Sequence, residues 1–289
     1  MSFKHNRGNG QFMGAKISDQ EFVKIRNLVY EKAGINLHEG KKSLVQARLG
    51  KIIRREGFSG FDDYYGQILN DDTGNRLVEL LDTISTNHTY FFREDDHLTW
   101  LSETILPDIL TLKSVKGEGE IRIWSAGCST GEEPYTLAMQ ILENDVLSPQ
   151  MRVKMLATDL STRVIETAKT GLYKPEKVKT VPGPILKKYF HKKRGGNENL
   201  YQVSQRVRDL ITFHVLNLLS PFPFQRQFAL IFCRNVMIYF DKPTQNRVVN
   251  KFYEVLKPGG YFIVGHSESL SSVKHNFQYV APTIYRKDG

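Results

Sequence analysis

The sequence predicts an α/β protein. A doubly wound, mostly parallel Rossmann-like sheet follows a small N-terminal all-α domain and carries a small inserted antiparallel β subdomain. Three observations predict this architecture. Apolar residues recur at helical spacing, without a convincing strand, over roughly the first 85 residues. Short apolar strands then alternate with helices from Glu120 onward, which is typical of a parallel sheet covered on both faces. One basic, glycine-bearing stretch, Tyr189 to Val207, breaks this alternation and suggests short paired strands.

The composition fits a globular protein and leaves the type of partner open. Of 289 residues, 40% are hydrophobic and 25% are charged, which excludes a disordered chain. Forty basic residues against 31 acidic ones leave a net charge of +9. This excess favours an acidic partner, which composition alone leaves as nucleic acid, an anionic membrane or an acidic protein surface.

No segment predicts a membrane span, a signal peptide or a metal site. Polar residues interrupt the longest apolar run, Phe228 to Phe240, so it is too short to span a membrane. Residues 1–16 are polar and glycine-rich, and they predict a disordered lead rather than a signal peptide. Cys128 and Cys233 are too few for a disulfide framework or a paired-cysteine metal site. We therefore expect a cytoplasmic protein that binds no metal.

Four helices account for the N-terminal domain. Ser18 and Glu21 have the spacing of a capping box at the start of the first helix. Further helices are expected at about 42–56, where Gly57 ends the helix, from about Phe61, and at about 76–85. We place this helical domain at residues 17–88 and the α/β domain at residues 89–289.

The alternating pattern predicts the elements of the α/β domain. The expected strands are 121–125, 153–158, 211–216, 229–233 and 261–264. The expected helices are 134–144, 162–169 and 243–256, the last of which ends at the turn signal Lys257-Pro258-Gly259-Gly260. The β subdomain is expected at about 189–208, with short strands suggested by Leu200, Gln202-Val203 and Arg206-Val207.

The loop after the first strand is the most informative segment. It reads Trp124-Ser125-Ala126-Gly127-Cys128-Ser129-Thr130-Gly131-Glu132-Glu133-Pro134, which is a strand, a glycine turn and the start of a helix. No Lys-Ser/Thr pair follows the last glycine, so the loop is not a phosphate-binding P-loop. Glu132 and Glu133 would repel a pyrophosphate. A cationic ligand with hydroxyl groups, such as S-adenosylmethionine, suits them better.

The two glutamates also have a structural interpretation, because carboxylates in the first turn of a helix complement its dipole. Asp159, at the end of the second expected strand, favours the ligand interpretation. A carboxylate at this position can accept hydrogen bonds from ribose hydroxyls.

Five segments, in the same order along nearly the whole chain, resemble the CheR-type chemotaxis receptor methyltransferases. These segments are Ser85–Glu94, Trp124–Tyr135, Ala157–Asp159, Asn217-Leu218 and Phe232–Asp241. The resemblance implies a methyltransferase sheet that binds S-adenosylmethionine and releases S-adenosylhomocysteine. It implies methylation of glutamate side chains on the cytoplasmic helices of methyl-accepting chemoreceptors, which forms methyl esters for chemotaxis adaptation. The membrane would be reached only through these receptors.

The resemblance also implies site residues. The cofactor-binding positions that it carries over are Asn87, Thr89, Arg93, Glu133, Asp159, Asn217, Leu218, Arg234 and Asn235. It places Tyr239 at the methyl-transfer site. The stretch His191–Gln205 resembles a subdomain that in some members docks a receptor's C-terminal peptide. Gly195 and Gly196 are adjacent here and Asn199 stands where glycine is expected, so peptide docking stays open.

Methyl transfer to a carboxylate requires no general base, because a free glutamate with a pKa of about 4.3 is already ionised at pH 7. The site must mainly desolvate and align the reacting groups. We assign two catalytic residues: Arg93 to clamp the cofactor's carboxylate and Tyr239 to orient the substrate oxygen. Taken alone, Tyr239 also fits a core aromatic at a strand end. His88 is interpreted as a loop histidine, and both cysteines as small buried residues.

The second helix carries a basic stripe, formed by Lys41, Arg48, Lys51 and Arg55 on one face. The opposite face is apolar, with Val45, Leu49, Ile52 and Ile53. A solvated charged face is the ordinary interpretation. By resemblance, the helical domain contacts the substrate, and we assign Arg48, Lys51 and Arg55 to acidic receptor helices. Phosphate binding by the stripe stays open.

Two rival functions are less consistent with the sequence. The positive charge favours a nucleic-acid methyltransferase, but neither an Asp/Asn-Pro-Pro-aromatic turn nor a Pro-Cys nucleophile occurs, so we expect no nucleic-acid partner. A non-catalytic module that only senses the cofactor is the second rival. Arg93, Asp159 and Tyr239 argue against it.

Overall fold

The computed structural model describes residues 16–148, 150–195 and 198–289. The chain forms two compact units. The first extends to Glu31 and continues over Leu37–Ile84, and the second comprises Lys32–Asn36 and Ser85–Gly289. Residues 1–15 of the predicted disordered lead lie outside the described residues. Within the described residues, no helix is long and apolar enough to cross a membrane.

The first unit is helical, as predicted. Its elements are α1 (Asp19–Ala33), the 3-10 turn η1 (Glu39–Lys41), α2 (Lys42–Glu56), α3 (Phe61–Leu69) and α4 (Asn75–Ile84). The predicted capping box is present, since Ser18 Oγ accepts from the Glu21 N–H at 3.2 Å and a Glu21 carboxylate oxygen accepts from the Ser18 N–H at 2.8 Å. Gly57, with φ of +78°, ends α2. The predicted apolar face of α2 is buried.

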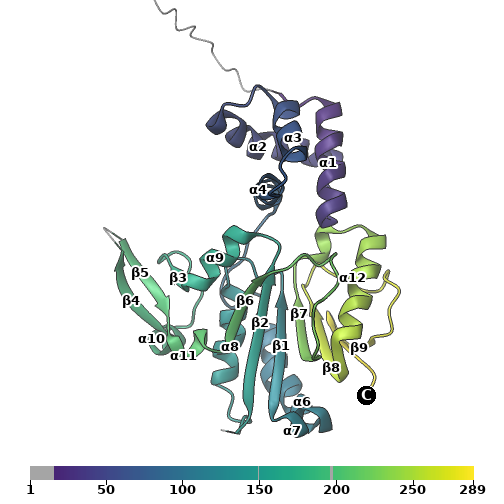
Figure 1. Ribbon diagram of the computed structural model, residues 1–289. Coiled ribbons are helices and arrows are strands. Elements are labelled where there is room, and N and C mark those ends of the chain that lie inside the picture. Colours follow the sequence, from purple (N-terminus) through teal and green to yellow (C-terminus); the bar gives the residue numbers. More distant parts are fainter. Residues whose placement is uncertain (1–15, 149, 196–197) are drawn as a thin grey trace, which may run out of the picture. The chain divides into compact units, whose positions relative to one another are not determined.

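The second unit contains a seven-stranded sheet (Figure 1). Its strands lie in the order β6 (Ile211–Val215), β2 (Arg152–Asp159), β1 (Glu120–Ala126), β7 (Phe228–Cys233), β8 (Leu256–Val264), β10 (Ile284–Arg286) and β9 (Gln278–Ala281). The pairs among the first five strands are parallel, and β10 pairs antiparallel to both β8 and β9. The predicted doubly wound, mostly parallel sheet is confirmed. The order reverses between β1 and β7, which is where such sheets bind ligands.

Two apolar layers cover the faces of this sheet, because successive strand residues point to opposite sides. Ile123 of β1 and Leu230 of β7 belong to one core cluster, and Trp124 and Ile231 belong to the other. The first cluster includes residues of α5 (Asp95–Trp100), the π-helical turn η2 (Leu101–Ile105), α6 (Leu106–Thr111), α7 (Lys113–Glu118), α8 (Glu132–Leu142) and α9 (Thr162–Thr170). The second includes residues of α12 (Lys242–Val255). The helices between residues 95 and 118 were not predicted.

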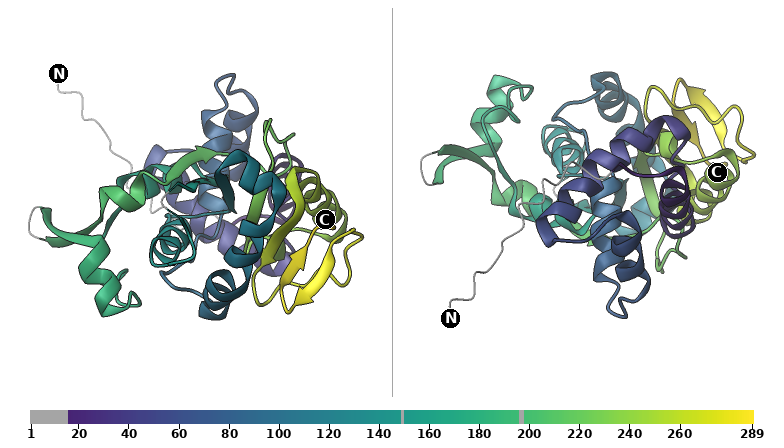
Figure 2. Two further views of the ribbon diagram at one scale, coloured as in Figure 1. Left: turned by 90° about the horizontal axis from the view of Figure 1, so that it is seen from below. Right: turned by 90° about the horizontal axis from the view of Figure 1, so that it is seen from above.

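The β subdomain is a separate three-stranded sheet that projects away from the main sheet (Figures 1 and 2). Its strands lie in the order β3 (Leu172–Tyr173), β5 (Glu198–Val203) and β4 (Phe190–Gly195), and the short helix α10 (Gly183–Tyr189) connects β3 to β4. The predicted strand at Arg206-Val207 is wrong, because these residues lie in the short helix α11 (Gln205–Arg208). The Ser204 carbonyl accepts from the Val207 and Arg208 N–H groups, both at 3.1 Å, which closes a helical turn that buries Val207. Gly196, one of the two adjacent glycines, lies outside the described residues.

The predicted turn at 257–260 is a second difference. These residues lie at the start of β8, where the pairing register with β7 shifts between Phe228 and Leu230. Lys257 is buried there and its ammonium is 2.5 Å from a carboxylate oxygen of Glu118. The turn residues do end α12 at Val255, and they appear as an irregularity at the start of β8, where Gly259 has φ of +76°.

Candidate functional site

The glycine loop after β1 packs tightly against two neighbouring segments at the carboxyl edge of the sheet. Gly127 has φ of +86°, and a Cβ at this position would lie 2.3 Å from Val236 Cγ2. The N–H groups of Gly127 and Cys128 donate to the Thr158 carbonyl at 2.7 and 2.9 Å. The loop thus bends from the end of β1 over the end of β2, and a side chain at Gly127 would displace it.

Asp159 is fixed at the end of β2 by the backbone. Its side chain is buried, and its two oxygens accept from the Ser129 N–H at 2.8 Å and the Ser161 N–H at 3.0 Å. Ser129 itself has φ of +49°, a conformation that the hydrogen bond helps to hold. A carboxylate oxygen can accept more than one hydrogen bond, so these backbone contacts do not by themselves prevent Asp159 from binding a ligand hydroxyl.

The two glutamates at the start of α8 have different surroundings. Glu132 is fully buried and pairs with Lys177, whose ammonium lies 3.1 Å from Glu132 Oε1. Glu133 accepts from Ser125 Oγ at 2.7 Å and lies 3.4 Å from Arg234 Nη1. Burial raises the pKa of Glu133 although the nearby Arg234 guanidinium lowers it. Of the two glutamates, Glu133 is the one that faces other predicted site residues.

Arg234 and Asn235, which follow β7, are held by Glu94. Glu94 Oε2 accepts from Arg234 Nε at 3.1 Å and from Nη2 at 2.9 Å. Glu94 Oε1 accepts from Asn235 Nδ2 at 3.3 Å. Burial alone would raise the pKa of Glu94, but the charge and hydrogen bonds of Arg234 outweigh it and lower the pKa. Sequence reasoning assigned Glu94 no role, although it ends the Ser85–Glu94 segment.

The segment before α5 carries three predicted residues, of which Asn87 contacts the glycine loop. The Asn87 carbonyl accepts from Ser129 Oγ at 3.1 Å, and Thr89 is half-buried. Arg93 donates from Nη1 to the His88 carbonyl at 3.1 Å, and its guanidinium lies 5.7 Å from the centre of the Tyr90 ring. The Arg93 side chain is 26% exposed, so part of its guanidinium remains accessible to a ligand.

Asn217 and Leu218 follow β6, the strand beside β2. Asn217 Nδ2 donates to the Lys32 carbonyl at 2.6 Å, and Oδ1 accepts from the Leu219 N–H at 2.9 Å. Leu218 is buried in the core cluster that contains α12. Both side chains shape the turn after β6, and their ligand role stays a prediction.

Tyr239 ends the 3-10 helix η3 (Met237–Tyr239) and is half-buried, so it is not a core residue at a strand end. Its hydroxyl donates to the Thr86 carbonyl at 3.2 Å. Sequence reasoning missed the residue that fixes this turn. Buried Glu268 accepts backbone N–H groups from Asn235 at 2.7 Å, Gly265 at 2.6 Å and Ile238 at 3.2 Å. The Gly-His-Ser-Glu sequence just after the last parallel strand was the only signal for it.

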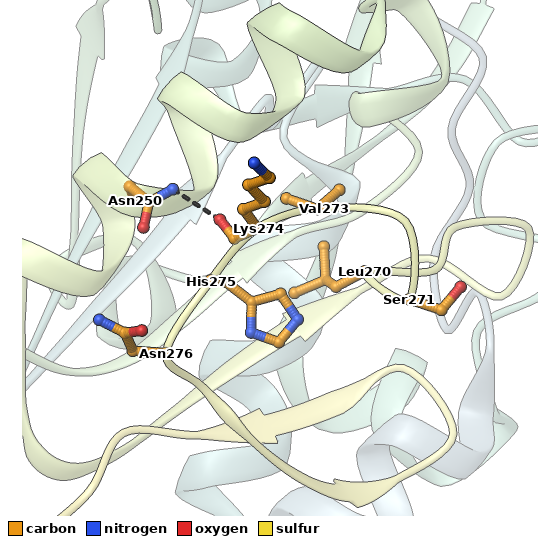
Figure 3. Close-up of a pocket in the computed structure, with 7 residues that line it drawn as sticks. All are labelled: Asn250, Leu270, Ser271, Val273, Lys274, His275 and Asn276. Carbon is orange, nitrogen blue, oxygen red and sulfur yellow. Dashed lines mark hydrogen bonds between the residues drawn. The ribbon is translucent and has the colours of Figure 1, made fainter.

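The described residues also line two pockets. One has a volume of about 230 Å³, and Met237, Ile238 and Glu268 belong to its wall, so it lies directly beside η3. The other, of about 500 Å³, is formed by α12 and the segment before β9, with Asn250 donating to the Lys274 carbonyl (Figure 3). No residue that lines this larger pocket is a predicted site residue.

The predicted receptor-binding residues lie in the first unit and differ in their surroundings. Arg48 donates to the carbonyls of Ile84 at 2.6 Å and Thr83 at 3.3 Å, so it binds the C-terminal end of α4. Arg55 pairs with Glu56 and Glu79, each at 2.6 Å. Lys51 is exposed. The basic stripe is therefore partly engaged within its own unit.

The two cysteines are fully buried, as expected, and burial raises the pKa of both thiols. A protonated, inaccessible thiol does not act as a nucleophile. This arrangement is consistent with a packing role for Cys128 in the glycine loop and for Cys233 at the end of β7.

Comparison with known proteins gives the same division into an all-α part and an α/β part. The family described as CheR methyltransferase, SAM binding domain, matches residues 87–286, and CheR methyltransferase, all-alpha domain, matches residues 20–85. A chemotaxis protein methyltransferase of Borreliella burgdorferi is 42% identical and covers 100% of both chains. A probable chemotaxis protein methyltransferase of Rhizobium etli is 38% identical over 90% of this chain and 96% of its own. A chemotaxis protein methyltransferase of Escherichia coli is 35% identical over 93% and 91%.

Proposed function

Because the chain belongs to the CheR methyltransferase family, we propose that it transfers methyl groups from S-adenosylmethionine to glutamate side chains of chemoreceptor cytoplasmic helices. The products would be glutamate methyl esters and S-adenosylhomocysteine. The observation that carries the proposal is the contact network at the carboxyl edge of the sheet. It links Asn87 to Ser129, Ser129 to Asp159, and Arg234 to Glu133.

The residues at this edge fit S-adenosylmethionine. Asp159 offers a fixed, buried carboxylate to the ribose hydroxyls. Glu133 offers a buried carboxylate, and burial raises its pKa, so a neighbouring cation would stabilise its charged form. Gly127 lets the loop pack directly against Val236, because a Cβ there would lie 2.3 Å from Val236 Cγ2. When bound, the cofactor supplies a methyl group on a positively charged sulfur.

The protein's own part in the reaction is to bind, align and exclude water. The glutamate substrate is already ionised at neutral pH, so no residue has to remove a proton from it. The Arg93 guanidinium is available to hold a carboxylate. The Tyr239 hydroxyl, now donating to the Thr86 carbonyl, can turn to the incoming glutamate oxygen. Orientation of this kind accelerates a displacement without acid–base chemistry.

Radiolabelled methyl transfer to receptor-containing membranes tests the proposal. We expect label that base releases, because an ester hydrolyses whereas an N-methyl group does not. Tyr239→Phe should keep affinity for S-adenosylhomocysteine and lower kcat and kcat/KM together by about five- to a hundredfold. Tyr279→Phe, at a tyrosine that is 66% exposed, is the matched control. Base-stable label, or an unchanged kcat for Tyr239→Phe, would contradict the ester assignment or the role of Tyr239, respectively.

Two finer predictions are tested separately. Docking of a receptor's C-terminal peptide at the β subdomain stays a prediction, and titration with that peptide would test it. Contact of Lys51 with acidic receptor helices also stays a prediction, and the charge-reversal experiment described below addresses it.

A further inference from the structure

Three residues with metal-binding side chains converge next to Arg234. Glu94 precedes α5, His97 lies within α5, and His266 follows β8. One ligand atom from each lies within 4.8 Å of the other two. The two imidazole rings meet edge to face, with centroids 4.8 Å apart. His97 is buried, whereas the His266 side chain is 48% exposed, so the cluster reaches from the core to the surface.

The contacts of Thr283 favour the His97 tautomer that carries its proton on Nε2. Thr283 Oγ1 donates its proton to the Pro282 carbonyl at 2.5 Å and lies 2.6 Å from His97 Nε2. Because the hydroxyl has only one proton, the His97 tautomer with its proton on Nε2 satisfies both contacts, and we assign this tautomer. In the neutral ring, Nδ1 is then an acceptor. It is buried without a hydrogen-bond partner and faces Glu94 Oε2 at 3.4 Å. Two acceptors facing each other favour a cation between them.

His266 is oriented in the manner of a metal ligand. Its Nε2 lies 2.9 Å from a carboxylate oxygen of Asp96. A carboxylate that accepts from one ring nitrogen fixes the tautomer and leaves the other nitrogen available for a metal. Histidines that bind metals commonly have such a carboxylate partner. Asp96 therefore prepares His266 without being a ligand itself.

We propose that Glu94, His97 and His266 form a binding site for a first-row divalent cation, with Zn²⁺ the best match. Two imidazole nitrogens and one carboxylate are a preferred zinc ligand set, and the exposed side of His266 leaves a fourth position for water. At zinc–ligand distances of about 2.0–2.2 Å, tetrahedral ligand atoms lie roughly 3.4 Å apart. The longest distance in the cluster must therefore shorten by up to about 1.4 Å, and the half-exposed His266 side chain can supply this movement.

Arg234 makes this site an inhibitory one. Its guanidinium already binds Glu94 Oε2 at 2.9 and 3.1 Å, so the metal and Arg234 compete for one carboxylate and repel each other. Arg234 also donates to the Arg93 carbonyl and faces Glu133. Zinc at Glu94 would thus loosen a group that orders the cofactor site. This coupling rests on the proposed function, whereas the metal site itself does not.

Calorimetric titration of the chelator-treated full chain with zinc chloride tests the site. We expect one Zn²⁺ per chain, with affinity at least tenfold weaker in His266→Ala and also weakened in Asp96→Asn. His191→Ala, at an exposed histidine of β4, is the matched control and should bind as the parent does. Co²⁺ absorption bands of a nitrogen–oxygen site should appear in the parent and disappear in His266→Ala. Absence of zinc binding, or equal binding by the parent and His266→Ala, would overturn the assignment.

The antagonism with the cofactor has its own test. Zinc should weaken S-adenosylhomocysteine binding, and S-adenosylhomocysteine should weaken zinc binding by the same factor, because the coupling is reciprocal. His266→Ala should keep the basal affinity for S-adenosylhomocysteine and lose its sensitivity to zinc. Zinc binding that leaves S-adenosylhomocysteine affinity unchanged would overturn the inhibitory coupling. Failure of S-adenosylhomocysteine to bind the zinc-free parent would instead contradict the proposed function.

Discussion

Glu268→Gln tests how the turn that carries Tyr239 is held in place. The Glu268 carboxylate is buried and is surrounded by backbone donors. Oε2 accepts from Asn235 at 2.7 Å and Gly265 at 2.6 Å, and Oε1 accepts from Ile238 at 3.2 Å. Asn235 has φ of +59°, in the left-handed region that asparagine adopts more readily than most residues other than glycine. Glutamine has the same shape but replaces one acceptor oxygen by an NH₂ donor.

The size of the expected effect of Glu268→Gln follows from the best orientation that the glutamine amide can take. Its oxygen would replace Oε2 and keep two hydrogen bonds, and its NH₂ would then face the Ile238 N–H. The hydrogen bond from the Ile238 N–H is lost, and this N–H then faces the glutamine NH₂, which is also a donor. A buried group left unsatisfied costs about 1–3 kcal/mol. If the cost falls on the local opening of this turn, the opening equilibrium rises about five- to 150-fold.

Hydrogen–deuterium exchange of the segment 235–240 measures this opening directly. We expect faster exchange in Glu268→Gln, together with a lower methyl-transfer rate, because Tyr239 loses its fixed position. Glu176→Gln, at an exposed glutamate, is the matched control. Exchange in Glu268→Gln that matches the parent would show that the carboxylate does not hold the turn. Faster exchange with an unchanged rate would refute the link between this turn and catalysis.

Four further predictions concern the cofactor, the substrate and the stability of the helical unit. Asp159→Asn should weaken S-adenosylhomocysteine binding by about tenfold or more, because a charged acceptor is lost. Burial raises the pKa of Glu133, so this carboxyl stabilises the fold below its ordinary pKa of 4.5, and that contribution is lost as pH rises through the raised value. A bound cation favours the ionised form, so S-adenosylmethionine affinity should rise with pH above 4.5, and Glu133→Gln should flatten the profile. Lys51→Glu should slow receptor methylation at low salt without changing stability. Arg48→Ala should destabilise the helical unit by about 1–3 kcal/mol, because the carbonyls at the end of α4 lose their hydrogen-bond donor.

Calorimetry and chemical unfolding separate these cases. Unchanged cofactor affinity in a folded Asp159→Asn protein would remove Asp159 from the site, and Asp209→Asn, at an exposed position, controls for the charge change. A pH profile that is equally steep in the parent and in Glu133→Gln would assign the titration to another group. Equal methylation by Lys51→Glu and the parent would return this lysine to an ordinary solvated surface.

The sequence by itself determined the elements whose signals are local. The Ser18–Glu21 capping box, the end of α2 at Gly57 and the alternating strands could be predicted because each depends on residues a few positions apart. The same holds for the glycine loop and for Asp159, since parallel strands bring their carboxyl ends to one edge. The resemblance supplied the remaining site residues, which spacing alone would not have selected.

Only the tertiary structure decided which charged groups pair. Glu94 and Arg234 are 140 residues apart in sequence, and Glu268 reaches back 33 residues to Asn235. Tertiary contacts also distinguish the residues of the basic stripe. Arg48 donates to the Ile84 carbonyl at the end of α4, whereas Lys51 stays exposed. Arg206-Val207 is helical, since burial of Val207 in the main core outweighs the strand preference of its neighbours. The physical reason is that hydrophobic period and capping act over one or two turns, whereas the partner of a buried charge is set by whichever segment the completed fold places beside it.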